Sequence, residues 1–325
     1  MRVLVTGGAG FIGSNFIRYM FSRYGGCSIT NLDKLTYCGN RNNLADIGSR
    51  KGYRFIKADI CDMDAVFPAA KGCDVIVNFA AESHVDRSIK DPEGFIKTNV
   101  NGVRVLLEAA VKCKVSRFIQ ISTDEVYGDV KKGFSKEEDA LMPNSPYAAS
   151  KAAADLLCRS YHKTYGLPVI ITRSSNNFGP YQYPEKMIPL FLTNAIEGKP
   201  LPVYGRGKNV RDWLYVIDNC SGIDYVMRKA RPGNIYNISG DRRIKNINIA
   251  KEILRIIGRG ERLISFVNDR PCHDTRYAMD SKKIKALGWR PLFDFDKALM
   301  LTAQWYMKNT NWWQDLKRRA NIIRW

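Results

Sequence analysis

The sequence predicts an α/β protein, with a doubly wound parallel sheet and a smaller, mixed C-terminal substrate-binding domain. Three features predict it: short apolar runs alternate with amphipathic stretches in the first half, a glycine-rich turn follows the first run, and Pro and Gly punctuate the chain from about Asn176 onward. We expect residues 1–175 to form the sheet domain, with a later contribution from about 210–240, and residues 176–325 to form mainly the second domain.

Six apolar runs are the expected strands. Each is short, rich in β-branched residues and mostly continuous, which is typical of parallel strands buried on both faces. They are residues 3–5, 28–32, 53–60, 75–79, 118–122 and 169–172. Between them, apolar residues recur at helical spacing over 15–24 and 94–113. Strand–helix–strand repetition of this kind implies right-handed crossovers.

Composition excludes several classes of protein. The chain has 325 residues, of which 45% are hydrophobic and 26% charged, as in globular proteins and unlike disordered ones. No apolar stretch approaches the ~20 residues that span a bilayer, and the N-terminus does not read as a secretory signal. We therefore expect a cytoplasmic protein that does not bind membranes. Eight cysteines stand singly beside only three histidines, which predicts reduced core thiols and no metal site.

The formal net charge of +19 raises the question of a nucleic-acid partner. The basic residues form only two short runs, 317–319 and 282–283. No zinc-finger, basic-zipper or RNA-recognition motif accompanies them. We therefore expect a basic surface and no nucleic-acid partner, since the alternative rests on charge alone.

A G-x-x-G-x-x-G pattern, with glycines at Gly7, Gly10 and Gly13, joins the first expected strand to the first helix. Glycines permit a tight turn there and let backbone N–H groups approach a pyrophosphate at the helix N-terminus. Asp33 stands 20 residues after Gly13, where a carboxylate accepts hydrogen bonds from the adenosine ribose. Its charge would repel a 2′-phosphate, so NAD is the expected cofactor, although neighbouring Lys34 weakens the case against NADP.

A second motif, Y-x-x-x-K, places Tyr147 and Lys151 on one face of an expected helix. A lysine ammonium beside a phenol favours the phenolate, so Tyr147 can act as a base near neutral pH. Together with the glycine-rich turn, this motif resembles the extended short-chain dehydrogenase/reductase superfamily over essentially the whole chain. The resemblance implies a Rossmann fold.

Adjacent acids at the end of the fifth expected strand, in Thr123-Asp124-Glu125, narrow the resemblance. Epimerases of the superfamily generally lack them, whereas in the nucleotide-sugar 4,6-dehydratases the adjacent Asp and Glu are catalytic. The series of matching segments is similar to the dTDP-glucose 4,6-dehydratase family up to Trp312-Trp313. These segments are residues 80–88, 175–181, 184–189, 211–213 and 269–274.

The resemblance implies a dehydration that passes through a transient ketone. Tyr147 takes the proton of the sugar 4-hydroxyl while hydride passes to NAD, and Thr123 hydrogen-bonds that oxygen. Glu125 removes the acidified hydrogen from carbon 5, Asp124 protonates the departing 6-hydroxyl, and the hydride returns to carbon 6. The two acids need separated pKa values for these opposite roles. With Lys151, these four residues complete the implied catalytic set.

The same resemblance implies two sets of binding residues. The cofactor-binding residues are Gly7, Gly10, Phe11, Ile12, Gly13, Asp33, Lys34, Thr36, Asp59, Ile60, Phe79, Ala80, Ala81, Thr98, Tyr147, Lys151 and Asn177. The residues for the nucleotide-diphosphate sugar are Ser83, His84, Thr123, Asn176, Lys186, Met187, Pro202, Val203, Tyr204, Arg211, Asn246, Arg270 and His273. Met187, where Leu is common, and Cys272, where Gly is usual, depart from the family. Cys272 puts the backbone of the diphosphate-binding segment in doubt, because glycine there would permit a positive φ.

Several alternatives remain open at this point. UDP-glucose could replace dTDP-glucose, since both diphosphates need the same arginines, and another epimerase or decarboxylase of the superfamily is the next alternative. A catalytically silent NAD-binding scaffold is the alternative from a different class. Apolar positions over 94–113 and 147–165 exceed one helix face, and the corresponding helices of related enzymes pair into a four-helix bundle. We therefore expect a homodimer through these two stretches.

Overall fold

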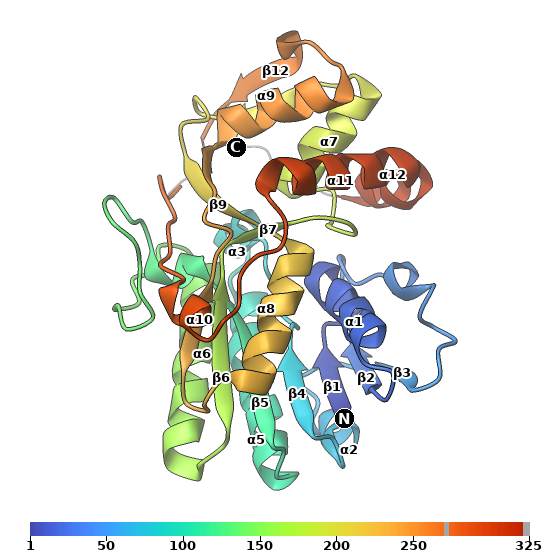
Figure 1. The fold of residues 1–325 in the computed structure, drawn as a ribbon, viewed down its shortest axis with the longest axis vertical. Helices are drawn as coiled ribbons and strands as arrows, with labels where there is room; N and C mark the ends of the chain where they lie inside the picture. Colours follow the sequence, from blue (N-terminus) through green and yellow to red (C-terminus); the bar gives the residue numbers. More distant parts are fainter. Residues whose placement is uncertain (270–272, 321–325) are drawn as a thin grey trace.

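A seven-stranded parallel sheet forms the base of the molecule, in the order β10-β6-β5-β4-β1-β2-β3 (Figure 1). The computed structural model describes residues 1–269 and 273–320. The strands are β1 (Arg2–Thr6), β2 (Ser28–Asp33), β3 (Tyr53–Lys57), β4 (Val75–Asn78), β5 (Arg117–Thr123), β6 (Val169–Ser174) and β10 (Ile235–Ile238). The predicted doubly wound α/β class is confirmed.

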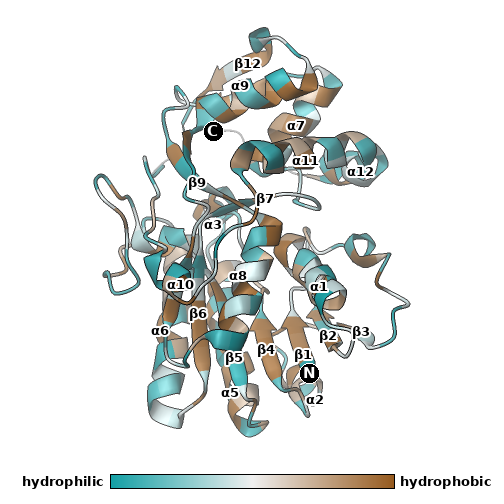
Figure 2. Ribbon diagram, in the orientation of Figure 1, coloured by the Kyte–Doolittle hydropathy of each residue, from teal (hydrophilic) through white to brown (hydrophobic). Residues whose placement is uncertain are grey.

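Helices cover both faces of this sheet because successive strand residues point to opposite sides. Val3 and Val5 of β1 belong to the core that includes α1 and α8, whereas Leu4 belongs to the core that includes α2, α5 and α6. The strands are accordingly apolar along much of their length (Figure 2). The helices are α1 (Phe11–Arg23), α2 (Met63–Ala70), α5 (Val103–Lys112), α6 (Pro146–Tyr165) and α8 (Val216–Lys229).

The strand order reverses at β1, which pairs with β2 on one side and β4 on the other. The loops that follow β1 and β4 therefore leave the sheet in opposite directions and open a crevice between them. In sheets of this kind, ligands bind in that crevice at the carboxyl ends of the strands.

The C-terminal part of the chain lies across this carboxyl edge (Figure 1). It holds a three-stranded sheet, in the order β11-β9-β7, and a two-stranded parallel sheet of β8 and β12. The strands are β7 (Asn176–Phe178), β8 (Leu201–Tyr204), β9 (Val210–Tyr215), β11 (Arg243–Lys245) and β12 (Ile264–Val267). The helices are α7 (Met187–Glu197), α9 (Asn246–Ile257), α10 (Lys282–Ala286), α11 (Phe295–Lys308) and α12 (Thr310–Arg319). One continuous core joins this part to the α1–α8 face of the main sheet.

The structure departs from the expected elements in three places. Strand β3 ends at Lys57 rather than at residue 60, and β10 is an additional strand. The expected helix over 94–113 begins as α4 (Glu93–Phe95), winds through a π-helical segment at Ile96–Gly102, and continues as α5. Within the described ranges, the search for a long apolar helix that could cross a bilayer finds none.

Candidate active site

The glycine-rich turn brings bare backbone close to the end of β4. Gly7 has a φ of +69°, and a Cβ atom there would lie 2.5 Å from the backbone nitrogen of Ala80. A Cβ atom at Gly13 would lie 2.4 Å from the carbonyl oxygen of Gly7, so α1 packs directly on the turn. This cradle of backbone at the N-terminus of α1 fits a dinucleotide pyrophosphate.

Asp33 ends β2 beside this turn. One carboxylate oxygen accepts a hydrogen bond from the backbone nitrogen of Ala9 at 2.9 Å, and the other accepts from that of Leu35 at 2.8 Å. Burial raises the pKa of Asp33, and these two hydrogen bonds oppose the rise. Lys34 points its ammonium at Asp59, 2.8 Å away. Because Lys34 is already paired with this carboxylate, it is poorly placed to attract a 2′-phosphate.

The remaining predicted cofactor residues gather around the same crevice, on the ends of neighbouring elements. Phe11 and Ile12 open α1, while Thr98 lies in the π-helical segment and Asn177 on β7. The others lie in the loops after strands: Thr36 after β2, Asp59 and Ile60 after β3, and Phe79, Ala80 and Ala81 after β4.

The catalytic candidates Thr123, Asp124 and Glu125 stand where β5 gives way to a single 3₁₀ turn. The hydroxyl of Thr123 accepts a hydrogen bond from the backbone nitrogen of Glu125 at 3.2 Å, which starts that turn. Asp124 is 3% exposed, and among the described residues its Oδ2 atom has no hydrogen-bond partner. Glu125 is half-buried and lines the large cavity described below.

The two adjacent carboxyls lie in different environments. Burial raises the pKa of Asp124 well above its usual value, and the charges of Glu125 and Asp212 raise it further. This direction of shift favours the protonated form, which a general acid needs. Glu125 faces the cavity, where a carboxylate can reach a ligand.

Tyr147 lies in the first turn of α6, which begins because Ser145 caps it and Pro146 fits its first position. The expected lowering of its pKa by Lys151 is wrong for this structure. Burial raises the pKa of Tyr147 instead, and the charge of Glu125 adds to the rise, while a hydrogen bond with Thr123 opposes it. Lys151 Nζ donates a hydrogen bond to the carbonyl oxygen of Ile121 on β5 at 2.6 Å.

A cavity of about 1080 Å³ opens between the main sheet and the C-terminal part. Ten predicted substrate residues line it: His84, Asn176, Lys186, Met187, Pro202, Val203, Tyr204, Arg211, Asn246 and His273. Ser83 touches this wall through its carbonyl oxygen, which accepts from Lys186 Nζ at 2.8 Å. Arg270 and Cys272 lie outside the described residues.

Arg211 is fixed by a residue that the sequence did not single out. Its guanidinium lies over the ring of Tyr277, 4.4 Å from the centroid, and its Nη2 donates to the carbonyl oxygen of Asp274 at 2.9 Å. Tyr277 is 3% exposed, and its hydroxyl donates to the Asp274 carboxylate at 2.5 Å. Stacking of this kind holds the planar guanidinium in one orientation.

A half-buried ion pair, also absent from the predicted site residues, joins the two parts of the molecule at the cavity wall. Arg87 Nη2 of α3 (Val85–Lys90) lies 2.9 Å from Glu185 Oε2, in the loop before α7. The Arg87 guanidinium also lies 3.8 Å from the ring centroid of Tyr37, a residue of the cofactor side. The three residues are 50 to 148 positions apart in sequence, so only the folded chain reveals the cluster.

Comparison with known proteins assigns the chain to a family. The family model described as GDP-mannose 4,6 dehydratase matches residues 4–302. A dTDP-glucose 4,6-dehydratase of Streptomyces niveus is 50% identical over 98% of this chain and 96% of its own. The chain belongs to the dTDP-glucose 4,6-dehydratase family.

Two further relatives of the family agree with this assignment. The low-salt glycan biosynthesis protein Agl12 of Haloferax volcanii is 51% identical over 94% of this chain and 99% of its own. The dTDP-glucose 4,6-dehydratase of Streptomyces venezuelae, solved with NAD bound, superposes with a TM-score of 0.96 at 48% identity, covering 97% of this chain and all of that one. The resemblance drawn from the three sequence motifs is thereby confirmed.

Proposed function

We propose that this chain is an NAD-dependent dTDP-glucose 4,6-dehydratase, a hydro-lyase that forms dTDP-4-keto-6-deoxy-glucose. The observation that carries the proposal is the pair of adjacent acids at the end of β5, of which Asp124 is buried with a raised pKa while Glu125 lines the cavity. Dehydration across two carbons needs one acid and one base, which two carboxyls in different environments can supply. The names of the relatives and the NAD held by the structural neighbours support both the reaction and the cofactor.

The roles proposed for the side chains follow from their positions. Bound in the crevice, NAD supplies the hydride acceptor for carbon 4, the hydride donor for carbon 6, and a positive charge that favours the phenolate of Tyr147. Tyr147 takes the proton of the sugar 4-hydroxyl. Thr123 hydrogen-bonds the hydroxyl of Tyr147 and orients the 4-hydroxyl for this transfer. Glu125 then removes the proton from carbon 5, and Asp124 gives its proton to the departing 6-hydroxyl to release water.

The nucleotide end of the substrate is assigned to the far part of the cavity. Arg211, stacked on Tyr277, offers its remaining N–H groups to the diphosphate. His273, four residues before Tyr277, is assigned to the same group. Lys186, Met187, Pro202, Val203 and Tyr204 form the adjoining wall for the nucleoside. We assign the cofactor to residues 1–175 together with 210–240, and the substrate mainly to 176–325.

The deciding experiment is incubation with dTDP-glucose and, separately, with UDP-glucose. The expected result is a 4-keto sugar from dTDP-glucose, detected by its absorbance in alkali, with the added NAD neither consumed nor reduced overall. Turnover of UDP-glucose alone would reassign the nucleotide, and a change of configuration at carbon 4 without loss of water would reassign the protein as an epimerase. Absence of any product while NAD remains bound would support the silent scaffold.

The proposal extends to assembly and location. Leu156 and Tyr165 of α6 and Ile96 before α5 are 57%, 60% and 52% exposed, and these apolar side chains support a homodimer through the two helical stretches. The seven cysteines within the described residues are free thiols, which supports a reducing, cytoplasmic location.

A further inference from the structure

Asp129 stands four residues after Glu125, just beyond the catalytic turn. Its Oδ1 atom accepts hydrogen bonds from the backbone nitrogen of Thr275, the hydroxyl of Thr275 and the backbone nitrogen of Arg276, each at 2.8 Å. Burial would raise the pKa of Asp129, but these hydrogen bonds outweigh it and lower the pKa. The carboxylate is therefore a charged acceptor for three donors, the strong kind of hydrogen-bonding group.

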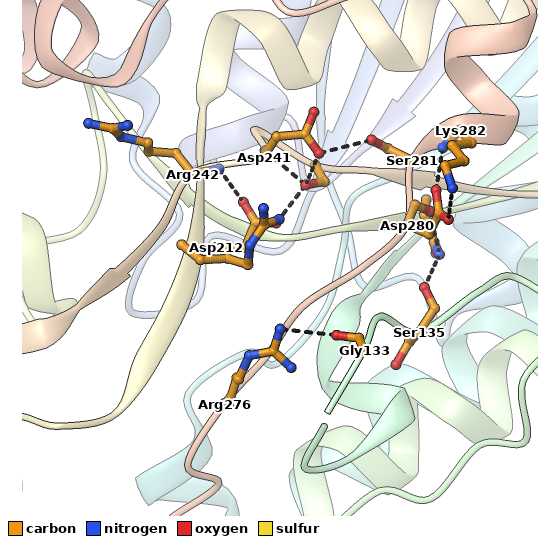
Figure 3. A network of polar contacts seen from close by, with 12 residues as sticks. Gly133, Ser135, Asp212, Asp241, Arg242, Arg276, Asp280, Ser281 and Lys282 are labelled. Atoms are coloured by element: carbon orange, nitrogen blue, oxygen red, sulfur yellow. Dashed lines mark hydrogen bonds and ion pairs between the residues drawn. The ribbon is translucent and has the colours of Figure 1, made fainter. Parts of the chain in front are cut away.

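The side chain of Arg276 also hydrogen-bonds the loop that follows Asp129. Its Nη1 donates to the carbonyl oxygen of Val130 at 2.8 Å, and its Nη2 donates to that of Gly133 at 3.0 Å (Figure 3). Farther along, the backbone nitrogen of Ser135 donates to Ala278 at 2.9 Å. We call residues 129–135 and 275–280, joined in this way, the clasp.

The second half of the clasp is also fastened to β9, which carries Arg211. The backbone nitrogen of Val210 donates to the carbonyl oxygen of Thr275 at 2.9 Å, and that of Tyr277 donates to Val210 at 3.2 Å. Figure 3 shows the continuation, where the hydroxyl of Ser281 lies 3.3 Å from the Asp241 carboxylate. The segment after residue 274 is thus held between the catalytic loop and the strand of the diphosphate arginine.

We propose that Asp129 is a positioning residue that sets the distance between the diphosphate-binding side chains and the Asp124–Glu125 pair. The inference rests on the proposed function. The sugar is attached to the diphosphate, so the place of its carbons 5 and 6 relative to the two acids depends on where Arg211 and His273 hold that diphosphate. A misplacement of about 1 Å can cost about a hundredfold in rate, so a joint of this kind affects the chemistry from outside the cavity.

The test compares two variants of one loop. Asp129→Asn removes the charge but keeps one oxygen acceptor. Asp139→Asn removes the charge of an exposed carboxylate that accepts a hydrogen bond from the nearby backbone nitrogen of Lys136 at 2.8 Å. With the holoenzyme, we expect Asp129→Asn to weaken dTDP binding about tenfold by calorimetry and to slow turnover of dTDP-glucose by about tenfold or more. Asp139→Asn should leave both unchanged.

Two further measurements separate positioning from a general loss of structure. In Asp129→Asn, the content of bound NAD should match that of the wild type. Reduced cofactor should accumulate during turnover, because oxidation at carbon 4 continues while the later elimination of water is slowed. Thr275→Val, which removes only the hydroxyl donor, should move all readouts in the same direction by a smaller factor.

Unchanged dTDP affinity and turnover in Asp129→Asn overturn the proposal, as does a loss of turnover that merely follows a loss of bound NAD. If the proposed function fails, the wild type itself does not turn over dTDP-glucose. The clasp is tested separately, by the ratio of dTDP affinity between Asp129→Asn and the wild type. A wild type that binds no dTDP overturns both proposals.

Discussion

The two adjacent acids at the end of β5 differ in burial, and this difference suits the opposite roles that we propose for them. Asp124 and Glu125 are neighbours with the same chemistry, yet Asp124 is 3% exposed and Glu125 lines the cavity. The pKa of the buried carboxyl is raised because ionisation there would lack water and would face the charge of its neighbour. The adjacency of the two acids is visible in the sequence, but their different burial is a property of the fold.

The roles of these acids can be separated by exchanging each for its amide. Glu125→Gln should keep bound NAD and lose exchange of the carbon 5 proton, because an amide cannot remove that proton. Asp124→Asn should mainly slow the departure of the 6-hydroxyl, by roughly 10²–10⁴-fold if general acid catalysis is its role. Incorporation of solvent deuterium at carbon 5 is the measurement, and wild-type incorporation in Glu125→Gln would contradict the assignment.

Asp212 gives a prediction for stability as a function of pH. It is fully buried, and burial raises its pKa to about 6. The hydroxyl of Ser239 donates a hydrogen bond to this carboxylate at 2.6 Å, which opposes the rise. Because the folded pKa exceeds the unfolded value of 3.8, this group favours folding below about pH 4, and that contribution is lost as the pH rises through 6. The shift corresponds to roughly 3 kcal/mol in the free energy of unfolding.

In Asp212→Asn this pH-dependent contribution should disappear. Urea unfolding between about pH 4 and about pH 7 should therefore show a smaller loss of stability in the variant than in the wild type. Glu138→Gln, at a carboxyl whose side chain is 73% exposed, is the matched control and should retain the wild-type slope. Equal slopes in all three proteins would mean that Asp212 ionises in the folded state as it does in the unfolded one.

At the scale of elements, the turn between β1 and α1 is defined by space rather than by side chains. An alanine at Gly13 would place its Cβ 2.4 Å from Gly7 O and 2.8 Å from the Cα of Gly8, so the turn must shift. We expect Gly13→Ala to lower the NAD content of the purified protein at least tenfold and to destabilise it by about 1–3 kcal/mol. Gly25→Ala is the control, since nothing lies within 4 Å of a Cβ atom there. NAD content and Tm equal to the wild type in Gly13→Ala would show that the turn yields without cost.

The expected elements were correct where local pattern determines them and incomplete where distant contacts do. Strand β10 escaped prediction because Asn237 interrupts its apolar residues. This side chain is satisfied only in the fold, where the hydroxyl of Tyr127 donates to its Oδ1 at 2.8 Å and its own amide donates to the carbonyl oxygen of Ser135 at 3.2 Å. Helical spacing over 94–113 likewise could not indicate the π-helical turns around Asn99, whose amide bonds Glu82 and Ser150 at 2.9 and 2.8 Å.

The same distinction applies to the site. Gly7, Asp33, Tyr147 and the acids after Thr123 each belong to a short motif, so the sequence alone could point to them. Tyr277 belongs to no such motif, and its importance arises only from the guanidinium stacked on it. Arg87 and Glu185 are 98 residues apart, and Asp129 and Thr275 are 146 apart, so no local pattern could pair them.

At the scale of the whole molecule, the Arg87–Glu185 and Asp129–Thr275 contacts both join the N-terminal part of the chain to the C-terminal part. Arg87 comes from the N-terminal part of the chain and Glu185 from the C-terminal part, and the same is true of Asp129 and Thr275. Each pair joins the carboxyl edge of the main sheet to the part that lies across it. The cavity therefore lies between two parts that share one continuous core and are also joined by these polar contacts.

The exposed face of α5 and α6 leads to the last prediction, which concerns assembly. Ala149, Ala153, Leu156 and Leu157 lie on one side of α6, where small alanines permit close approach of another helix. A homodimer that covers this face would bury about 2,000 Å² or more and give a mass about twice the 37.0 kDa of one chain. Light scattering at micromolar concentration should find that mass for the wild type and for Leu292→Glu, a control at a side chain that is 80% exposed elsewhere. Leu156→Glu should give the monomer mass, because a charge in the centre of an apolar helix interface lacks a partner. A wild type that scatters as a monomer would refute the dimer, and a Leu156→Glu variant that remains dimeric would move the interface to another face.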